Sequence, residues 1–346
     1  MTYLIILTLL FLAELLYFRV ADHFNIIDKP NERSSHSSIV LRGGGVIFSL
    51  SMIAWMVLMC IQGEMSIVLE YLPFLVGLLL VAGVSFWDDV KSLPDSIRLV
   101  VQFTAMALMF WSMGIMHWNM WWIVILASIV CVGATNVINF MDGINGITAG
   151  YALAVLVPLL LVNGGPIGLG MTGEAAGFID QSYLIVAIIG VLVFCIFNFR
   201  PKGKAKCFAG DVGSISIAFI LLYAIGRLVV QTQDITYLIF LLVYGIDGCL
   251  TIVHRIMLHE NLGEAHRKHA YQLMANELKI GHVKVSSLYM LLQLAVSLGF
   301  IYLCPDSVAA HWGYLVGTAV VLGVVYVLFK KKYYHLHEEY LNSLKK

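Results

Sequence analysis

The stretch from Asn136 to Asn145 combines side chains that could bind or react with residues typical of a turn. Asn136, Asn139 and Asp142 recur three residues apart at the end of a long apolar run. At helical spacing, steps of three keep side chains near one face. Polar groups at the mouth of an apolar helix are costly unless they meet water, a partner or a ligand. Because Asp, Asn and Gly are also common in caps and turns, this stretch alone leaves a site and a structural turn open.

Further polar clusters interrupt the apolar sequence. They are Asp28-Lys29-Pro30-Asn31-Glu32-Arg33-Ser34-Ser35-His36, Asp88-Asp89, Gly210-Asp211-Val212-Gly213-Ser214, Asp247 and His266-Arg267-Lys268-His269. Carboxylates that meet at one place repel one another unless a cation or a proton lies between them. Oxygen ligands without cysteine suit Mg²⁺, which is completed by substrate phosphates, and basic side chains suit phosphate oxygens. These residue types predict a site for a Mg²⁺-diphosphate, with Mn²⁺ as the alternative ion.

Most clusters also have a structural interpretation. Asp88 and Asp89 are adjacent, so both cannot face the same way on a straight helix. Asp211 precedes an apolar run and suits a helix N-cap. The stretch from His266 to His269 suits a solvated loop. Asp247 is the hardest to explain structurally, because an ionisable group within a membrane span is functional by default.

The elements that must position these clusters are membrane-spanning helices. The chain is 60% hydrophobic and 12% charged, whereas soluble domains carry about 25% charged residues. Apolar runs approach the length of about 20 residues that a span needs, without the alternation of a β-barrel. We therefore predict an all-α polytopic membrane protein, with a single integral-membrane domain over 1–330 and a basic tail over 331–346. The eleven predicted spans are about 3–18, 44–61, 69–87, 97–116, 121–138, 147–162, 183–199, 212–230, 235–253, 285–303 and 312–329.

The distribution of charge orients these spans. Of the 21 Lys and Arg residues, all except Arg227 fall on one set of alternate connections. Lys and Arg favour cytoplasmic loops, so the N-terminus is predicted outside and the C-terminus in the cytoplasm. Nearly every polar cluster falls on the same side. This shared side favours an active site that faces the cytoplasm, in a multi-pass protein of the inner membrane.

In this order, the clusters resemble the motifs of the polyprenyl-phosphate N-acetylhexosamine-1-phosphate transferases, a family that includes WecA, TarO and MraY. The matching pieces are Asp28-x-Pro30-x-x-Arg33-x-x-His36, Gly43-Gly44-Gly45, Asp88-Asp89, Asn136-x-x-Asn139-Phe140-x-Asp142-Gly143, Phe208-x-Gly210-Asp211-Val212-Gly213-Ser214, Asp247 and the histidine loop. The chain departs from the family at Asn145, where an Asp is common, so Asn145 is not predicted to be catalytic. It departs again at His266-Arg267-Lys268-His269, where His-x-His-His is common, and this leaves the sugar open.

The resemblance implies a reaction and a set of roles. A lipid phosphate, undecaprenyl phosphate, would attack the β-phosphorus of a UDP-N-acetylhexosamine, favoured as UDP-GlcNAc, and release UMP. Mg²⁺ would be held by Asp211 with help from Asp88. The catalytic residues implied are Asp88, Asp89 and Asp142, and the substrate-binding residues are Asn136, Asn139, Asp247, His266, Arg267, His269, Arg33 and His36. Whether Asp88 or Asp89 accepts a proton or holds the metal stays open, as does a homodimer. The expected partners are these substrates and membrane lipid, with no nucleic acid.

Three other interpretations remain. One is an enzyme that uses the muramoyl-pentapeptide nucleotide, as the MraY branch does. Another is a transporter with an acidic cytoplasmic cavity for cations or protons. Such a transporter needs polar residues through the bilayer, and beyond Asp247, Glu14 and Glu70 the spans offer few. The third is a non-catalytic scaffold, which leaves the clustered carboxylates unexplained.

Overall fold

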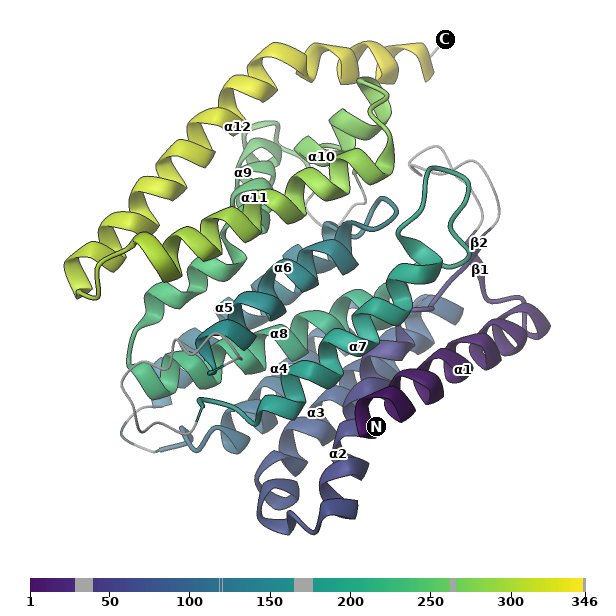
Figure 1. Ribbon diagram of the computed structural model, residues 1–346. Helices are drawn as coiled ribbons and strands as arrows, with labels where there is room; N and C mark the ends of the chain where they lie inside the picture. The colour runs from purple at the N-terminus through teal and green to yellow at the C-terminus, as the bar shows by residue number, and fades with distance from the viewer. Residues whose placement is uncertain (29–39, 118, 120, 165–176, 262–265, 345–346) are drawn as a thin grey trace.

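The computed structural model describes residues 1–28, 40–117, 119, 121–164, 177–261 and 266–344, and helices make up most of it (Figure 1). The α-helices are α1 (Thr2–His23), α2 (Val46–Gln62), α3 (Met65–Val90), α4 (Asp95–Ser112), α5 (Trp121–Phe140), α6 (Ile147–Val162), α7 (Gln181–Asn198), α8 (Gly210–Thr232), α9 (Leu242–Met257), α10 (Ala270–Gln272), α11 (His282–Leu303) and α12 (Val308–Leu344). A 3₁₀ segment, η2 (Ile235–Leu241), leads into α9, and a π-helical segment, η3 (Leu273–Glu277), follows α10. The strands β1 (Ile27–Asp28) and β2 (Val40–Leu41) form a short antiparallel ribbon.

The prediction of an all-α polytopic membrane protein is confirmed, and each of the eleven predicted spans contains a helix. In the described part of the chain, eight stretches are long and apolar enough to cross a membrane, while α2 and α6 are shorter apolar helices. The number of spans and their orientation stay predictions. Helix α12 continues past residue 330, through the boundary predicted between the membrane domain and the tail, as far as Leu344.

Helix α8 is the centre of the bundle. It packs against α2, α3, α5 and α6, and most of its residues are buried (Figure 1). A helix that is apolar on every side is stable only when neighbours surround it, which explains this position. Its N-terminus therefore lies among the ends of several other helices. This is the end that carries Asp211.

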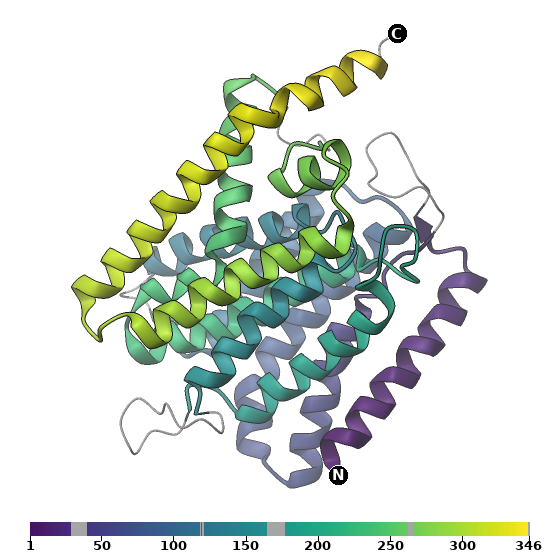
Figure 2. The ribbon, with the colours of Figure 1, turned by 45° about the horizontal axis from the view of Figure 1, so that its top comes forward.

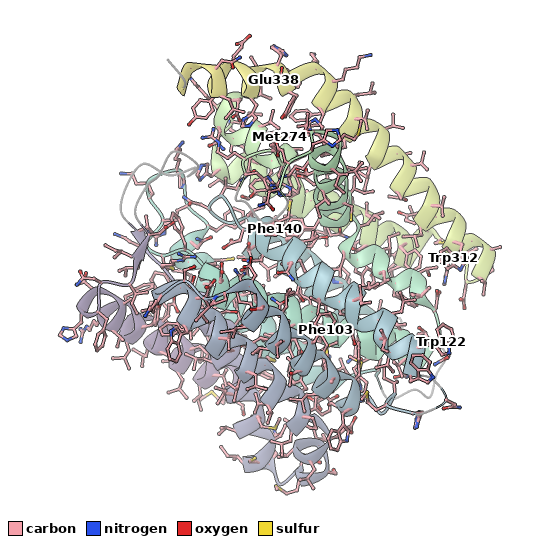
Figure 3. The ribbon with its side chains drawn as sticks, turned by 180° about the vertical axis from the view of Figure 1, so that it is seen from behind. Phe103, Trp122, Phe140, Met274, Trp312 and Glu338 are labelled. Carbon is pink, nitrogen blue, oxygen red and sulfur yellow. The ribbon has the colours of Figure 1, made fainter. Side chains whose placement is uncertain are left out.

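The outside of the bundle is also apolar. Phe103, Trp122 and Trp312 are each more than 40% exposed and point outward from α4, α5 and α12 (Figure 3). Exposed apolar side chains in such numbers are disfavoured in water and are expected where lipid surrounds the protein. This surface agrees with membrane embedding.

The N-termini of α2 and α8 approach each other through glycines. A Cβ built on Gly45 would lie 2.2 Å from the Cα of Gly213, and one built on Gly213 would lie 2.6 Å from the Cα of Gly45. The Gly45 N–H donates to the Ala209 carbonyl at 3.1 Å. Only glycine allows this contact, which brings Arg42, just before α2, beside the start of α8.

The C-terminal helices form a second layer. Helix α12 lies across the outside of the molecule next to α9 and η3, and α11 packs along α6 (Figure 2). The predicted cytoplasmic loop over 254–284 contains α10 and η3, so much of it is ordered around α12. This layer carries the histidine loop.

Candidate active site

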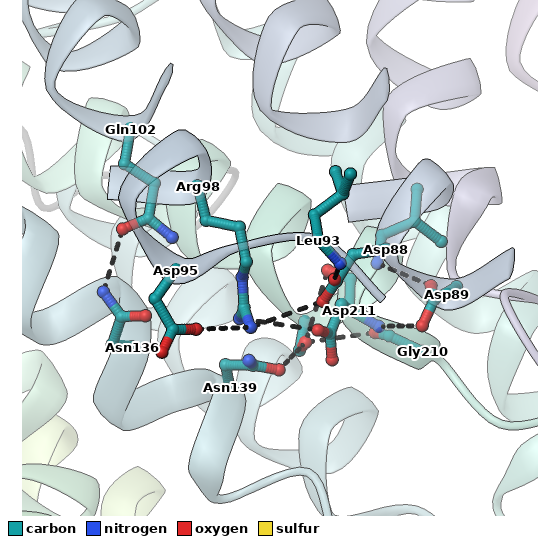
Figure 4. Close-up of polar contacts among 12 residues, drawn as sticks. Asp88, Asp89, Leu93, Asp95, Arg98, Gln102, Asn136, Asn139, Gly210 and Asp211 are labelled. Atoms are coloured by element: carbon teal, nitrogen blue, oxygen red, sulfur yellow. Dashed lines mark hydrogen bonds and ion pairs between the residues drawn. The ribbon is translucent and has the colours of Figure 1, made fainter. Parts of the chain in front are cut away.

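Asp88 and Asp211 meet at one end of the bundle. Asp88 lies near the C-terminus of α3 and Asp211 in the first turn of α8, and both carboxyl groups face Arg98 (Figure 4). The Arg98 guanidinium, from the first turn of α4, lies 3.3 Å from Asp88 Oδ2 and 3.5 Å from Asp211 Oδ2. The Leu93 N–H donates to Asp88 Oδ1 at 2.6 Å, which fixes that carboxylate. Two acids from distant parts of the chain thus share one guanidinium.

Asp89 faces a different way from Asp88. Its two oxygens accept the backbone N–H groups of Asp211 and Val212, at 2.9 and 3.0 Å, so it caps the N-terminus of α8. The Arg42 Nε lies 2.7 Å from Asp89 Oδ1, and the carboxylate is fully buried. Every oxygen of Asp89 is therefore used to hold α8 and Arg42 in place. The two acids diverge, as expected for adjacent residues on a helix.

The amides of α5 point toward this cluster from another side. Ser214 donates to Asn139 Oδ1 at 2.6 Å, which ties α5 to the first turn of α8. Asn136 Nδ2 donates to Gln102 Oε1 at 2.9 Å, which ties α5 to α4 (Figure 4). Both amides are neutral, so they add hydrogen-bonding groups near the acids without further repulsion.

Asp142 lies in the turn after α5. Burial raises the pKa of Asp142 to about 6, although the Thr148 hydroxyl donates to its carboxylate at 2.5 Å and acts in the opposite direction. The charges of Asp89 and Arg42 also act on it, so it belongs to the same electrostatic neighbourhood. A carboxyl group with this pKa can exchange a proton near neutral pH.

Asp247 is buried and accepts hydrogen bonds from several directions. The N–H of Ala270 donates to it at 3.0 Å, and the Tyr289 hydroxyl at 2.6 Å. His269 Nδ1 lies 3.3 Å away, while His269 Nε2 is buried without a partner among the described residues. Asp247 therefore holds the histidine loop in place, and the substrate-binding role predicted for it stays a prediction.

The histidine loop is tied to α5 as well. The Tyr271 hydroxyl donates to the carbonyl of Phe140, two residues before Asp142, at 3.0 Å. The rings of His266 and His269 lie 4.9 Å apart. Burial and neighbouring basic groups lower the pKa of His266 to about 3, so it is neutral at physiological pH. The two histidines therefore lie beside the turn that carries Asp142.

Arg267 turns toward the C-terminal helix. Its Nη2 lies 3.1 Å from Glu277 Oε1, and its guanidinium lies 4.5 Å from the centre of the Tyr340 ring. His337 Nδ1 lies 3.0 Å from the same Glu277 oxygen. We call Arg267, Glu277, His337 and Tyr340 the α12 clasp. It gives Arg267 a structural role in addition to the substrate-binding role predicted for it.

Arg42 and Arg98 were missed as site residues by the sequence reasoning, which used them only to orient the spans. Gln102 and Thr148, which hold Asn136 and Asp142, were also missed, whereas Ser214, which holds Asn139, was identified as part of a polar cluster without a role of its own. A signal for Arg98 was its place in the first turn of an apolar helix, where a charge needs a partner. Asn145 donates to the carbonyls of Arg200 and Pro201, so it ties the turn after α5 to the connection before α8. Arg33 and His36 lie outside the described residues.

Asp88 and Asp211 are the acids that could serve as ligands of Mg²⁺. Among the residues with described positions, no group of three or more His, Cys, Asp or Glu side chains is placed to hold a metal ion. Mg²⁺ is usually bound by one or two carboxylates together with substrate phosphates and water. Asp88 and Asp211 supply two such carboxylates, and Arg98 already lies between them as a cation. Their chemistry therefore fits a Mg²⁺ that arrives with a diphosphate.

Comparisons with known proteins agree with the motif resemblance. Residues 71–229 match the family described as Glycosyl transferase family 4. The chain is 24% identical over 275 residues to the Bacillus subtilis protein named "Probable undecaprenyl-phosphate N-acetylglucosaminyl 1-phosphate transferase", covering 74% of this chain and 72% of that protein. It is 26% identical over 137 residues to the phospho-N-acetylmuramoyl-pentapeptide-transferase of Thermotoga maritima, covering 39% of each chain.

The matched family region spans Asp88, Asp89, Asn136, Asn139, Asp142 and Asp211, and it ends before the histidine loop. The clustered acids and amides are therefore the part of the site that the family match covers. The resemblance predicted from the motifs is confirmed: this chain is similar to polyprenyl-phosphate sugar-phosphate transferases, and its residues 71–229 match the family described as Glycosyl transferase family 4.

Proposed function

We propose that this chain transfers N-acetylhexosamine 1-phosphate from a UDP-sugar to undecaprenyl phosphate at the cytoplasmic face of the inner membrane. The observation that carries the proposal is the convergence of Asp88 and Asp211 on Arg98, at the end of a bundle whose outer surface suits lipid. Such a site can receive a lipid phosphate from the membrane and a nucleotide diphosphate from water. The products are the lipid-diphosphate sugar and UMP, the first membrane step of a cell-envelope polysaccharide.

The reaction needs few covalent roles for the protein. An oxygen of the lipid phosphate forms a bond to the β-phosphorus, and the bond from that phosphorus to the bridging oxygen breaks. UMP leaves with the bridging oxygen. Catalysis of this kind rests on positioning and on neutralisation of charge. Arg98 and Arg42 supply fixed positive charge beside the acids. Of the two adjacent acids, Asp89 caps α8, so Asp88 is the one we propose either to accept the proton of the attacking phosphate or to help hold the metal ion.

Asp211 and Asp88 are the residues that would hold Mg²⁺. When bound, the ion would draw negative charge from the diphosphate oxygens. Asn139 and Asn136 are proposed to orient phosphate or nucleotide through neutral hydrogen bonds. His266 and His269 are proposed to contact the sugar or its phosphates, because the Tyr271 hydrogen bond brings their loop against Phe140.

UDP-GlcNAc is the donor we favour. The Bacillus subtilis relative is named for N-acetylglucosaminyl 1-phosphate transfer, and the match covers 72% of that protein. A second candidate donor is the muramoyl-pentapeptide nucleotide. The name of the Thermotoga maritima relative favours it, but that match is shorter and covers 39% of each chain. The reaction and the proposed acids are the same in both cases. Comparing UMP release from a panel of UDP-sugars therefore identifies the donor.

The test is release of UMP by purified protein from a panel of UDP-sugars, with and without Mg²⁺, Mn²⁺ and undecaprenyl phosphate. We expect UMP release that needs both the lipid phosphate and the divalent ion, with UDP-GlcNAc the best donor. Asp211→Asn should reduce turnover about a hundredfold or more while the protein stays folded. A transporter would release no UMP, and turnover of Asp211→Asn near the wild-type rate would remove Asp211 from the metal site.

A further inference from the structure

A cavity of about 470 Å³ opens between α9 and α12, away from the carboxylates. Its lining residues are Leu250, Val253, His254, Met257, Tyr326, Val327, Lys330, Lys331, Tyr334, His335 and Glu338. None of them belongs to the group of acids and amides described above. A cavity of this size holds a small polar group together with part of a hydrocarbon chain.

The lining changes character from one end to the other. Leu250, Val253 and Val327 come from the membrane-spanning parts of the two helices, and they make one end apolar. Lys331 and His335 lie further along α12, where the apolar sequence ends, and both are exposed. The cavity therefore has the polarity of an amphiphile, with a cationic end and a hydrocarbon end. Glu338 follows Lys331 and His335 along the same face of α12. Lys331 is therefore farther from this negative charge and nearer to the apolar end of the cavity.

Lys330 forms the floor between these ends. Its ammonium donates to the Lys268 carbonyl of the histidine loop, and it lies 4.9 Å from the centre of the Tyr334 ring and 5.7 Å from that of Tyr326. Since Lys330 is committed to these contacts, Lys331 is the lysine that a ligand can reach. The floor of the cavity is thereby linked to the loop that carries His266 and His269.

We propose that this cavity binds an anionic phospholipid, with its phosphate at Lys331 and His335 and an acyl chain along Leu250, Val253 and Val327. Charge complementarity selects the anionic headgroup, because basic residues just beyond a membrane span attract anionic lipid. A lipid-phosphate substrate is a different occupant, since its phosphate must reach Asp88 and Asp211. The proposal needs the protein to be in a membrane, but it does not need the transferase activity.

The bound lipid would also steady the histidine loop. The lipid phosphate would sit beside the helix turn that holds Lys330, and Lys330 holds the Lys268 carbonyl. Anything that binds the folded state alone raises its resistance to unfolding. We therefore expect phosphatidylglycerol to raise the melting temperature of the protein more than phosphatidylcholine does.

The experiment compares two neighbouring lysines. Lys331 lines the cavity, whereas Lys332 carries the same charge one residue later, is exposed, and lies 5.1 Å from the Tyr333 ring outside the cavity. Purified full-length protein in phosphatidylcholine nanodiscs is titrated with phosphatidylglycerol, with bound lipid counted by native mass spectrometry. Lys331→Gln should weaken phosphatidylglycerol binding about fivefold, and Lys332→Gln should leave it unchanged.

Three results would overturn the proposal. Equal weakening by the two variants would show diffuse attraction to a basic surface. Equal retention of phosphatidylglycerol and phosphatidylcholine by the wild type would remove the headgroup selectivity. Displacement of phosphatidylglycerol by one equivalent of undecaprenyl phosphate would make the cavity part of the substrate path. Lipid binding is measured without UDP-sugar, so the two proposals can fail separately. Absence of selective phosphatidylglycerol binding would not affect the proposed transferase activity, and absence of UMP release would not affect the proposed lipid site.

Discussion

Two adjacent acids in this protein have different surroundings and so different tasks. Asp88 is held by the Leu93 N–H and faces Arg98, close to Asp211. Asp89 is fully buried, caps α8 and binds Arg42. The sequence left their roles open, because adjacency on a helix shows only that the two side chains diverge. From these contacts we propose a reactive role for Asp88 and a positioning role for Asp89.

Replacing each acid by its amide separates these tasks. Asp89→Asn should lower the free energy of unfolding by about 2–3 kcal/mol, because a buried charge pair and two hydrogen bonds to α8 are weakened. Asp88→Asn should leave the melting temperature near that of the wild type and reduce UMP release about a hundredfold or more. Thermal unfolding in detergent and UMP release are the two measurements. The reverse pattern would exchange the two roles.

The pH dependence of transfer tests Asp142. Its pKa is raised by burial to about 6, so the carboxylate becomes protonated as the pH falls through that value. If the ionised form is required, the rate should fall below about pH 6. The Thr148 hydroxyl stabilises the ionised form, so Thr148→Val should move this acid limb to higher pH, while Thr148→Ser, which keeps the hydroxyl, should not. An unchanged profile in Thr148→Val would separate Asp142 from the limiting step.

At the scale of elements, glycine contacts set where the acids lie. Helices α2 and α8 meet at Gly45 and Gly213 with almost no space between their backbones. That contact places Arg42 next to the Asp89 carboxylate and the first turn of α8. The sequence reasoning identified Gly43-Gly44-Gly45 only through the motif resemblance. The partner of Gly45 lies more than 160 residues away and could not be found from local patterns.

Adding a methyl group at this contact should separate the two helix ends. Gly45→Ala is expected to destabilise the protein by about 1–3 kcal/mol and to reduce transfer, because its Cβ would meet the backbone of Gly213. Gly83→Ala is the matched control, since Gly83 lies in helix α3 with no atom within 4 Å of a new Cβ. The control should be neutral or slightly stabilising, because alanine favours helices. Wild-type stability and activity in Gly45→Ala would show that the two backbones can move apart freely.

The α12 clasp connects the end of the last helix to the histidine loop. Glu277→Gln keeps the size of the side chain but removes the charge shared by Arg267 and His337. If the loop contacts the nucleotide sugar, the KM for UDP-GlcNAc should rise about tenfold with a smaller change in kcat. Glu339→Gln, an exposed change on the same helix, is the control. A proportional loss of kcat without a change in KM would place the clasp in the chemical step.

At the scale of the whole molecule, sequence predicted the bundle better than the site. Continuous apolar runs identified a helix for every predicted span, because lipid leaves few alternatives to helices. The acids were found because charges are rare in such a chain. Asp247 was predicted to bind substrate, which stays a prediction, while its hydrogen bonds to Ala270 of the loop and to Tyr289 of α11 were not predicted. Hydrogen-bond partners depend on which helix ends meet, and hydropathy does not contain that information. The continuation of α12 past residue 330 was missed for a similar reason, since its partners Arg267 and Glu277 lie far away in sequence.

The orientation of the bundle is the last prediction, and it rests on the placement of Lys and Arg. In a background in which the six native cysteines are replaced by serine, single cysteines at two exposed positions test it: Lys204→Cys, in the connection predicted to be cytoplasmic, and Ser307→Cys, in the connection predicted to be outside. In intact cells, a membrane-impermeant maleimide should label Ser307→Cys and should label Lys204→Cys only after permeabilisation. The loop with Lys204 leads directly into α8, so its side is also the side of Asp211 and Asp88. Labelling of Lys204→Cys in intact cells would place the acids outside, away from any cytoplasmic UDP-sugar, and the proposed reaction would fail with the orientation.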